Sequence, residues 1–119
     1  MSLTRTVDEL GEAVLRELGV IDAVETPDAD DLDYIEERYI EKFHALAAHG
    51  LDLTYWTATS IPVAVFLTMR DLMMNEVRGA FGEPMAPEDK EAREIVILKA
   101  LRRHMSRPKT GHAIVGEYF

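Results

Sequence analysis

Cysteine is absent from this sequence of 119 residues. The chain therefore has no disulfide framework, no thiolate metal site and no cysteine nucleophile. Long apolar runs are absent too, because no stretch reaches the roughly 18 uncharged, mainly apolar residues that a membrane span requires; the longest uncharged stretch, residues 53–69, has 17 residues and includes Pro62 and several Thr. The first residues, MSLTRTVDELGEAV, contain no apolar run of the kind found in signal peptides. We expect a chain that is neither exported by a signal peptide nor embedded in a membrane.

The motifs of common catalytic and nucleotide-binding sites are missing as well. Ser60 does not lie in a G-x-S-x-G motif, and no glycine-rich phosphate loop occurs. No pair of groups has the spacing that proton transfer or nucleophilic attack needs. The sequence predicts a protein that is not an enzyme and that needs no cofactor.

Two metal-binding patterns are suggested by the acidic residues, and both fail on spacing. An EF-hand beginning at Asp28 would place Leu32 at a ligand position and Asp33 at the glycine of the sharp turn. A di-iron bundle needs Glu-x-x-His motifs on facing helices, and the chain has one, Glu41 to His44. We interpret the acidic run as a solvated loop and a first helical turn stabilised by the helix dipole. No metal site is predicted.

Charge is distributed unevenly along the chain. Residues 1–59 hold 14 acids and 4 bases, whereas residues 60–119 hold 8 acids and 9 bases. From Lys99 to His112 there are five Lys or Arg residues and no acid. An acidic body disfavours tight wrapping around nucleic acid, since such binding depends on Lys and Arg neutralising phosphates. The basic end could still bind a phosphate or an acidic protein.

Apolar residues recur at helical spacing in four segments, which suits one domain with a single core. The first helix starts with a capping box, Thr6 with Glu9, and stops at Gly19. The second follows a loop over residues 20–29 and stops at Gly50. The third is capped by Ser60, and the fourth starts at Pro87. The predicted apolar faces are Val7, Leu10, Val14, Leu15 and Leu18; Leu32, Ile35, Tyr39, Ile40, Phe43 and Leu46; Val63, Phe66, Leu67, Arg70, Met73, Met74 and Val77; and Ile95, Leu98, Leu101 and Met105.

The fold class predicted is all-α, a small four-helix bundle over residues 1–105 with an extended C-terminal arm over residues 106–119. Residues 51–59 are read as a loop, in which Tyr55 and Trp56 either cover the end of the bundle or face a partner. The apolar end of the arm either docks on its own bundle or binds a neighbour's groove or sheet edge.

In the order of its elements the chain resembles the head-tail connector proteins of tailed phages and gene transfer agents, the adaptor group that includes head-completion proteins. The resemblance starts at VDELGEAVLRELGV, continues after an acidic gap through IEKFHALAAHGLDLTYW and SIPVAVFLTMRDLMMNEVRGAFGEP, and ends with the last helix and the basic, proline-containing tail. It covers nearly the whole chain, and no single stretch is diagnostic.

The resemblance implies a bacteriophage virion protein at the head-tail junction, assembled in the host cytoplasm. Members of the group form a ring of roughly twelve copies, a closed cyclic assembly, beneath the portal protein. Their C-terminal arms dock into the portal, the next connector or a tail protein binds below, and DNA passes through the channel without specific binding. No membrane is involved.

Three sets of residues are expected to serve these contacts. Tyr55 and Trp56 are candidates for contact with the next ring or the tail. Asp28, Asp30 and Asp31 are candidates for lining the channel, where like charge would keep DNA from sticking. The expected portal-binding residues are Arg102, Arg103, Arg107, Pro108, Lys109, His112, Ile114, Val115, Tyr118 and Phe119.

A different class of function fits the same composition. A small acidic helical regulator or antitoxin-like module would use a basic C-terminal helix to bind nucleic acid. Residues 93–105, however, interleave their bases with the predicted buried stripe, where a recognition helix would present a groove-facing set. The two hypotheses differ in whether the basic end binds DNA.

Overall fold

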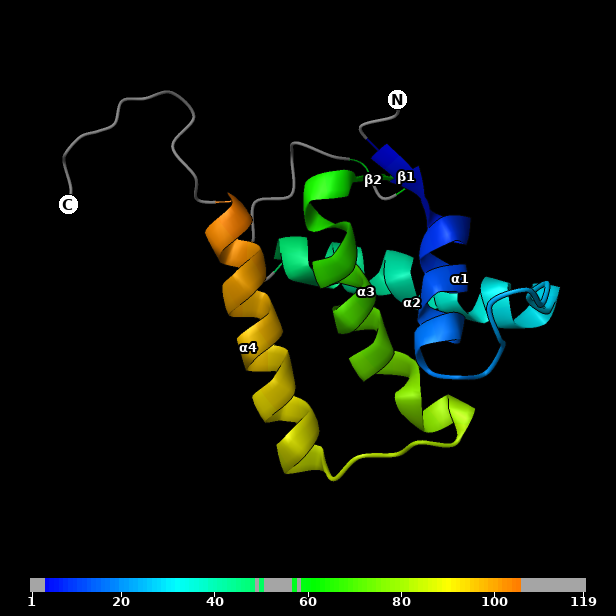
Figure 1. The fold of residues 1–119 in the computed structure, drawn as a ribbon. Coiled ribbons are helices and arrows are strands. Elements are labelled where there is room, and N and C mark those ends of the chain that lie inside the picture. The colour runs from blue at the N-terminus through cyan, green and yellow to red at the C-terminus, as the bar shows by residue number, and fades with distance from the viewer. Residues whose placement is uncertain (1–3, 49, 51–56, 58, 106–119) are drawn as a thin grey trace, which may run out of the picture.

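The structure is a computed structural model that describes residues 4–48, 50, 57 and 59–105 (Figure 1). The predicted C-terminal arm lies outside them. As predicted, this part of the chain is predominantly helical. None of its helices has the length and apolarity that crossing a membrane requires. The elements are β1 (Thr4–Thr6), α1 (Val7–Glu17), α2 (Ala29–Ala48), β2 (Ser60–Pro62), α3 (Val63–Val77), the 3-10 helix η1 (Arg78–Phe81) and α4 (Pro87–Met105).

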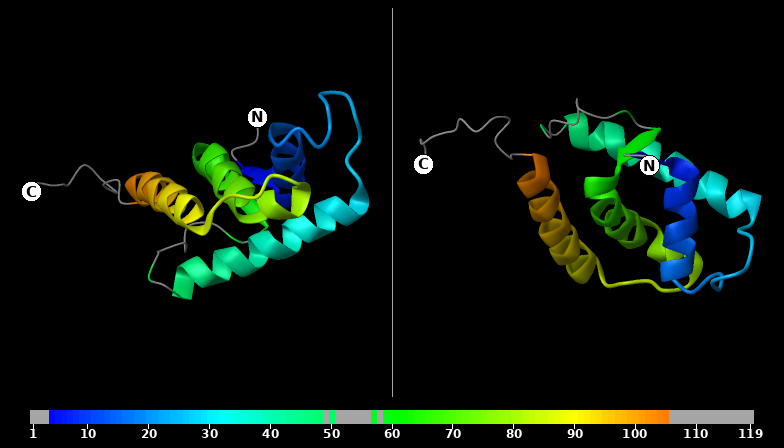
Figure 2. Two further views of the ribbon diagram at one scale, coloured as in Figure 1. Left: turned by 90° about the horizontal axis from the view of Figure 1, so that it is seen from below. Right: turned by 45° about the horizontal axis from the view of Figure 1, so that its top comes forward.

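The helices are arranged in two layers. α1, α3 and α4 lie side by side with α3 in the middle, and α2 runs across one face of this group (Figures 1 and 2). α3 packs on each of the other three helices, whereas α4 packs mainly on α3. The predicted four-helix bundle is not confirmed, because α2 crosses the other helices.

α1 begins and ends where the sequence predicts. Thr6 Oγ1 accepts a hydrogen bond from the Glu9 N–H at 3.1 Å, and Glu9 Oε1 accepts one from the Thr6 N–H at 2.8 Å. This reciprocal pair is the predicted capping box, which satisfies two N–H groups that the helix itself leaves without partners. At the other end, Gly19 has a φ of 79°, a left-handed conformation that favours glycine after a helix.

Replacing Thr6 with alanine should lower the free energy of unfolding by about 1 kcal/mol, since the Glu9 N–H loses its acceptor. Chemical denaturation followed by circular dichroism measures the change. Thr26→Ala, in the exposed loop before α2, is the matched control and should stay within about 0.5 kcal/mol of the unmodified chain. Equal effects of the two substitutions would contradict a capping role for Thr6.

The predicted apolar faces of α1 and α2 are confirmed. Val14 of α1 and Ile35 and Tyr39 of α2 are fully buried in the core. Gly11 lies where the two helices approach closely, because a Cβ at this position would lie 3.0 Å from Cδ2 of Leu32. The missing side chain therefore allows α1 and α2 to pack at short range.

The start of the third helix differs from the prediction. Ser60 does not cap it; residues Ser60–Pro62 form β2, which pairs antiparallel with β1, and α3 begins at Val63. Ile61 of β2 lies opposite Arg5 and is fully buried. The prediction failed because pairing between segments so distant in sequence leaves no periodic signal in either of them. Of the loop predicted over residues 51–59, only Thr57 and Thr59 are described.

The faces of α3 and α4 were partly mispredicted. Phe66, Met73 and Val77 are buried as expected, but Val63 and Leu67 are 49% and 59% exposed. Val65, Met69 and Leu72 are buried instead. α3 carries apolar residues on several sides and packs on three helices, so its spacing does not single out one face.

In α4, Leu101 is buried and Leu98 is partly buried as predicted, whereas Ile95 is 53% exposed. Ile97 takes its place in the core. The run of four apolar residues at positions 95–98 fits two alternative stripes, and contact with α3 selects the one through Ile97. The side chain of Met105, the last member of the predicted stripe, is not among those described.

Candidate partner-binding surfaces

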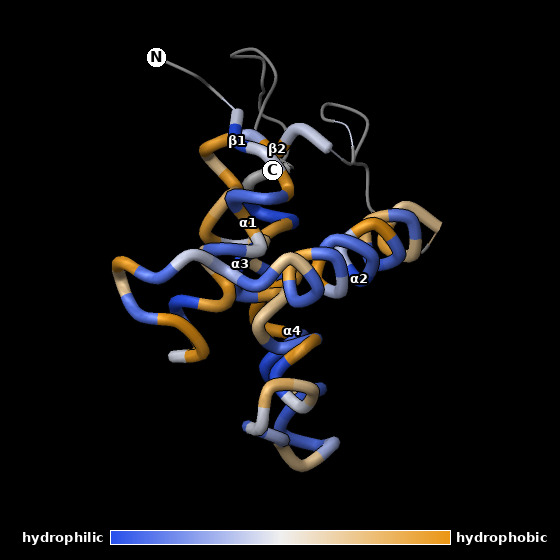
Figure 3. The backbone as a smooth tube through the Cα atoms, turned by 90° about the vertical axis from the view of Figure 1, so that its right-hand side faces the viewer, coloured by the Kyte–Doolittle hydropathy of each residue, from blue (hydrophilic) through white to orange (hydrophobic). Residues whose placement is uncertain are grey.

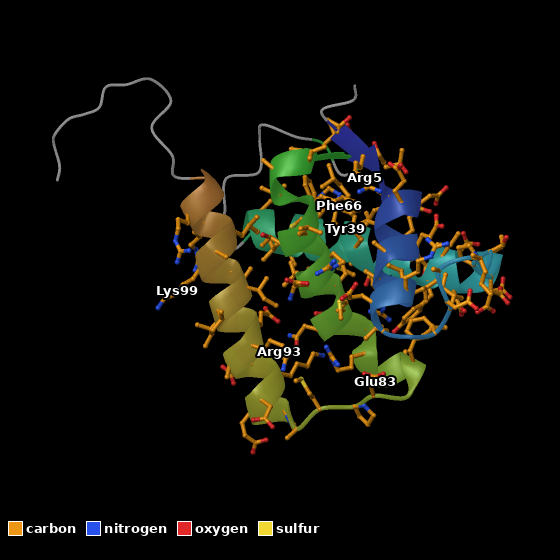
Figure 4. The ribbon with its side chains drawn as sticks, viewed as in Figure 1. Arg5, Tyr39, Phe66, Glu83, Arg93 and Lys99 are labelled. Atoms are coloured by element: carbon orange, nitrogen blue, oxygen red, sulfur yellow. The ribbon has the colours of Figure 1, made fainter. Side chains whose placement is uncertain are left out.

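The C-terminal half of α4 presents bases to solvent. Lys99, Arg102 and Arg103 are exposed, and none of them forms an ion pair with another described residue. In Figure 4, Lys99 projects away from the rest of the molecule. Their place near the helix C-terminus is favourable, because cations there interact with the helix dipole. These bases are therefore available to an acidic partner.

Most of the residues expected to contact partners lie outside the described residues. Arg102 and Arg103 are the two members of the portal-binding set that the structure places. Neither Tyr55 nor Trp56 is described, so the expectation for this pair remains a prediction. The remaining portal-binding candidates outside the described residues are Arg107, Pro108, Lys109, His112, Ile114, Val115, Tyr118 and Phe119.

The acids expected to line a channel lie together at the start of α2. Asp28 Oδ1 accepts a hydrogen bond from the Asp30 N–H at 2.8 Å, so Asp28 caps the helix. Asp30 is exposed and Asp31 is partly buried in the first turn. All three positions are favourable for a carboxylate beside the N-terminus of a helix. Asp28 thus has a structural role in addition to any contact with a partner.

The loop before α2 is held in one conformation by hydrogen bonds. Asp22 Oδ1 accepts from the N–H groups of Val24 and Glu25 at 3.0 and 2.9 Å. Arg16 of α1 donates to the carbonyl oxygens of Asp22 and Glu25 at 3.2 and 3.1 Å and pairs with Glu12. Val24, at the tip of this turn, is 89% exposed. An ordered acidic turn therefore presents an apolar side chain to solvent.

The acidic region continues from this turn into α2. Between Asp22 and Glu37 the sequence holds eight acids and no Lys or Arg. Asp33 and Glu37 are exposed, lie one turn apart and form no ion pair with other described residues. Hydrophilic residues alternate with hydrophobic ones along α2 in Figure 3, as an amphipathic helix requires. The segment from residue 22 to residue 37 is called the acidic end below.

A partly buried ion-pair triangle joins three helices on the inner side of α2. The Lys42 ammonium lies 3.4 Å from Glu76 Oε1 of α3 and 3.0 Å from Glu94 Oε2 of α4. Partial burial acts to lower the pKa of Lys42, but the hydrogen bond to Glu94 and the charge of Glu76 outweigh it. The pKa of Lys42 is therefore raised. The triangle thus links α4 to α2 as well as to α3.

A shallow hollow of about 340 Å³ lies between α1 and α3, and it is an unpromising site for an anion. Arg5, Arg16 and Arg70 line it. Arg5 approaches Glu9 at 3.8 Å and stacks on the Phe66 ring at 4.2 Å, as Figure 4 shows. Arg70 pairs with Glu17 and Asp71, and Arg16 pairs with Glu12. Each guanidinium thus already has a carboxylate partner.

The described residues contain no group of three or more His, Asp or Glu side chains placed to hold a metal ion. The described surface carries exposed bases at one end of the molecule and exposed acids at the other. Exposed apolar side chains lie beside both groups of charges. Comparisons with known protein families, curated proteins and solved structures give no match for this chain.

The sequence-based prediction missed the exposed apolar residues of α4. Val96 is 66% exposed beside Ile95, which was assigned to the core. Arg93 lines a groove between α3 and α4 together with Met74 and Ile97, and no described acid pairs with it. The signal available was the length of the apolar run from Ile95 to Leu98, since a helix packed on one neighbour buries only part of such a run.

Proposed function

We propose that this chain is a structural adaptor that forms a ring below the portal at the head-tail junction of a tailed phage. It is a virion protein, assembled in the host cytoplasm, and its body is a small bundle-like group of helices. The observation that carries the proposal is the basic end of α4. Lys99, Arg102 and Arg103 are exposed, have no described acidic partner, and lead directly into a basic arm with an apolar end.

In this proposal, the arm docks into the portal protein. The bases that meet acidic portal surface are Arg102, Arg103, Arg107 and Lys109. The apolar side chains that pack or pair as an added strand are Ile114, Val115, Tyr118 and Phe119. A ring multiplies a weak contact by its number of copies, so an arm of modest affinity holds firmly through avidity. An arm that follows directly on the last helix suits this requirement.

The remaining surfaces serve the other contacts of a connector. Tyr55 and Trp56 meet the next connector or a tail protein on the side away from the portal. Asp28, Asp30 and Asp31 carry negative charge that keeps DNA from sticking as it passes through the channel. Two features of the described residues support a contact role, the exposed charges at both ends and the exposed Val24, Ile95 and Val96.

Deleting residues 107–119 should abolish binding of the chain to purified portal rings while the helices stay folded. Avidity raises the affinity of a ring for the portal by about 10²–10⁴-fold over that of a single arm. Loss of the arms should therefore be visible in a co-sedimentation assay. Circular dichroism checks the fold. The matched control is the pair Tyr55→Ala and Trp56→Ala, which should retain portal binding and impair tail joining. Unchanged portal binding after the deletion would end the proposal.

The exposed bases of α4 also favour one other function, binding of nucleic acid by a small regulatory module. Filter binding across a range of salt concentrations separates the two functions. If Lys99, Arg102 and Arg103 contact phosphates, the logarithm of the affinity should fall with the logarithm of salt at a slope of about −0.9 per contact. For the adaptor, retention of nucleic acid on the filter should be negligible at physiological salt.

A further inference from the structure

The outer face of α4 has no partner among the described residues. This face comprises Ala92, Ile95, Val96, Lys99, Arg102 and Arg103, all of them exposed. α4 rests on α3 through Ile97 and Leu101, on its opposite side. Beside Val96, a hollow of about 460 Å³ is lined by Met85, Asp89, Ala92 and Arg93. Apolar side chains at the centre of a face, with charge at its edge, are typical of a protein interface.

The charges on this face indicate which kind of protein surface can bind it. The acids of α4 lie before Ile95, and from Ile95 to Met105 the helix holds three Lys or Arg residues and no acid. None of these bases is neutralised by a described residue. A matching surface must therefore be acidic and must offer an apolar contact to Ile95 and Val96.

The acidic end of the same chain has both properties. Its eight acids are accompanied by no base. Val24 projects from it at 89% exposure, on a turn fixed by the hydrogen bonds of Asp22 and Arg16. Because the turn is ordered before binding, it loses little conformational entropy when a partner covers it.

The two surfaces lie at opposite ends of the molecule. In Figures 1 and 2, α4 is at one side, and the loop leading into α2 is at the other, with α1 and α3 between them. One chain therefore cannot satisfy its own two surfaces. A second copy can do so, and each added copy leaves one free surface of each kind, which generates a ring if the rotation closes.

We propose that the outer face of α4 docks on the acidic end of a second copy of this chain, in a head-to-tail contact. The inference rests on the proposed ring and names the surfaces that build it. Ile95 and Val96 contact Val24 of the neighbour, and Lys99, Arg102 and Arg103 meet acids such as Asp33 and Glu37. Arg102 and Arg103 then bind the neighbouring copy in place of the portal, and the portal contact is made by the arm from residue 107 onwards.

Charge reversal at each end tests the contact. Arg102→Glu with Arg103→Glu, or Asp33→Lys with Glu37→Lys, should each lower the association constant by about tenfold or more, since like charges then face one another. All four substitutions combined in one chain should restore association. The matched control, Asp8→Lys with Glu88→Lys, changes net charge as much as the acidic-end variant does, at exposed positions outside both surfaces. Sedimentation velocity over a range of protein and salt concentrations gives the constants.

Introduced cysteines give a second readout, because the chain has none of its own. Val24→Cys with Val96→Cys should form a ladder of disulfide-linked oligomers under mild oxidation. Val24→Cys with Val63→Cys is the control, since Val63 is exposed at the start of α3, beside Thr4 and Arg5 of the β1 segment. Its crosslinks should stop at dimers or form more slowly.

The outcomes separate this contact from the adaptor role. Failure of the combined reversal to restore association, or a ladder no faster than the control, overturns the contact. The combined variant regains self-association and keeps the whole arm, so its binding to portal rings tests the adaptor role separately from the contact. Rescued self-association without any portal binding keeps the contact and overturns the adaptor role.

Discussion

Replacing Tyr39 with alanine is expected to lower the free energy of unfolding by about 3–5 kcal/mol. Tyr39 is fully buried in the middle of α2, where its ring lies 6.1 Å from that of Phe43. Removing the ring loses its burial and leaves a cavity that surrounding side chains fill only in part. A domain of this size has about 5–15 kcal/mol of stability, so the loss is a large fraction of the total.

Urea denaturation followed by circular dichroism measures this effect, and an unchanged slope with denaturant would show that stability alone is altered. Tyr34→Ala is the matched control on the same helix. Tyr34 is partly buried; its ring lies edge-on to Phe81, with ring centroids 6.0 Å apart, and beneath the Arg38 guanidinium at 5.5 Å, so the expected cost is about 1 kcal/mol. A larger loss of unfolding free energy for Tyr34→Ala than for Tyr39→Ala would contradict the central position of Tyr39 in the core.

Replacing Lys42 with methionine should cost about 2–3 kcal/mol. The Lys42 side chain is 18% exposed, and its ammonium is the positive charge between Glu76 and Glu94. Without it, two partly buried carboxylates from α3 and α4 lose the cation that they share, which is costly because uncompensated charge is left behind. Most of the cost should be recovered by adding Glu94→Gln, since one charge is then removed.

Arg38→Met is the control for Lys42→Met. Arg38 also pairs with a carboxylate, Glu41 at 3.1 Å, but both side chains are largely exposed, so little change in stability is expected. If Arg38→Met lowered the free energy of unfolding as much as Lys42→Met, partial burial would not explain the cost at Lys42.

The raised pKa of Lys42 fixes the direction of its pH dependence. A folded-state pKa above the unfolded value means that the stabilisation is complete below the unfolded pKa of about 10.4 and is lost as pH rises through the folded value. Stability measured in alkaline solution should therefore fall less steeply for Lys42→Met than for the unmodified chain. A steeper fall in the variant would contradict this assignment.

Local signals in the sequence were sufficient to predict the start of α1 and the buried faces of α1 and α2. Thr6 and Glu9 form the predicted capping box, and the faces through Val14 and Tyr39 are buried as spaced. Each of these helices has one apolar face with polar residues opposite, so periodicity determines which side is buried. The start of α4 at Pro87 was predicted for a similar reason, because proline is favoured in a first turn.

Interactions between distant segments were not predictable in this way. The pairing of Arg5 with Ile61 depends on tertiary structure, and the three-residue strands it joins carry no alternation of their own. Lys42, Glu76 and Glu94 come from three helices, and nothing in their separate surroundings shows that they meet. The same limit explains why Ile95 was assigned to the core, since its exposure depends on which neighbour α4 finds.

The candidate surfaces were likewise predictable from the sequence only in part. Acids near Asp28 and bases at Arg102 and Arg103 were evident from charge patterning, and the structure places them at the start of α2 and the end of α4. Their positions at opposite ends of the molecule, together with the exposure of Val24 and Val96, required the fold. Charge along a chain is visible in sequence, whereas the direction in which it faces is a property of packing.

The helices should differ in how cooperatively they unfold, because α4 depends mainly on α3 for its contacts. α1, α2, α3 and the small sheet hold one another through several mutual contacts, whereas α4 follows a connection over residues 82–86, packs mainly on α3 and is linked to α2 by the ion pair of Glu94 with Lys42. Such an element can open by itself at a free energy below that of global unfolding, and its amide hydrogens then exchange sooner than those of the core helices. The last helix can thus adjust its position while the remainder of the protein keeps its structure.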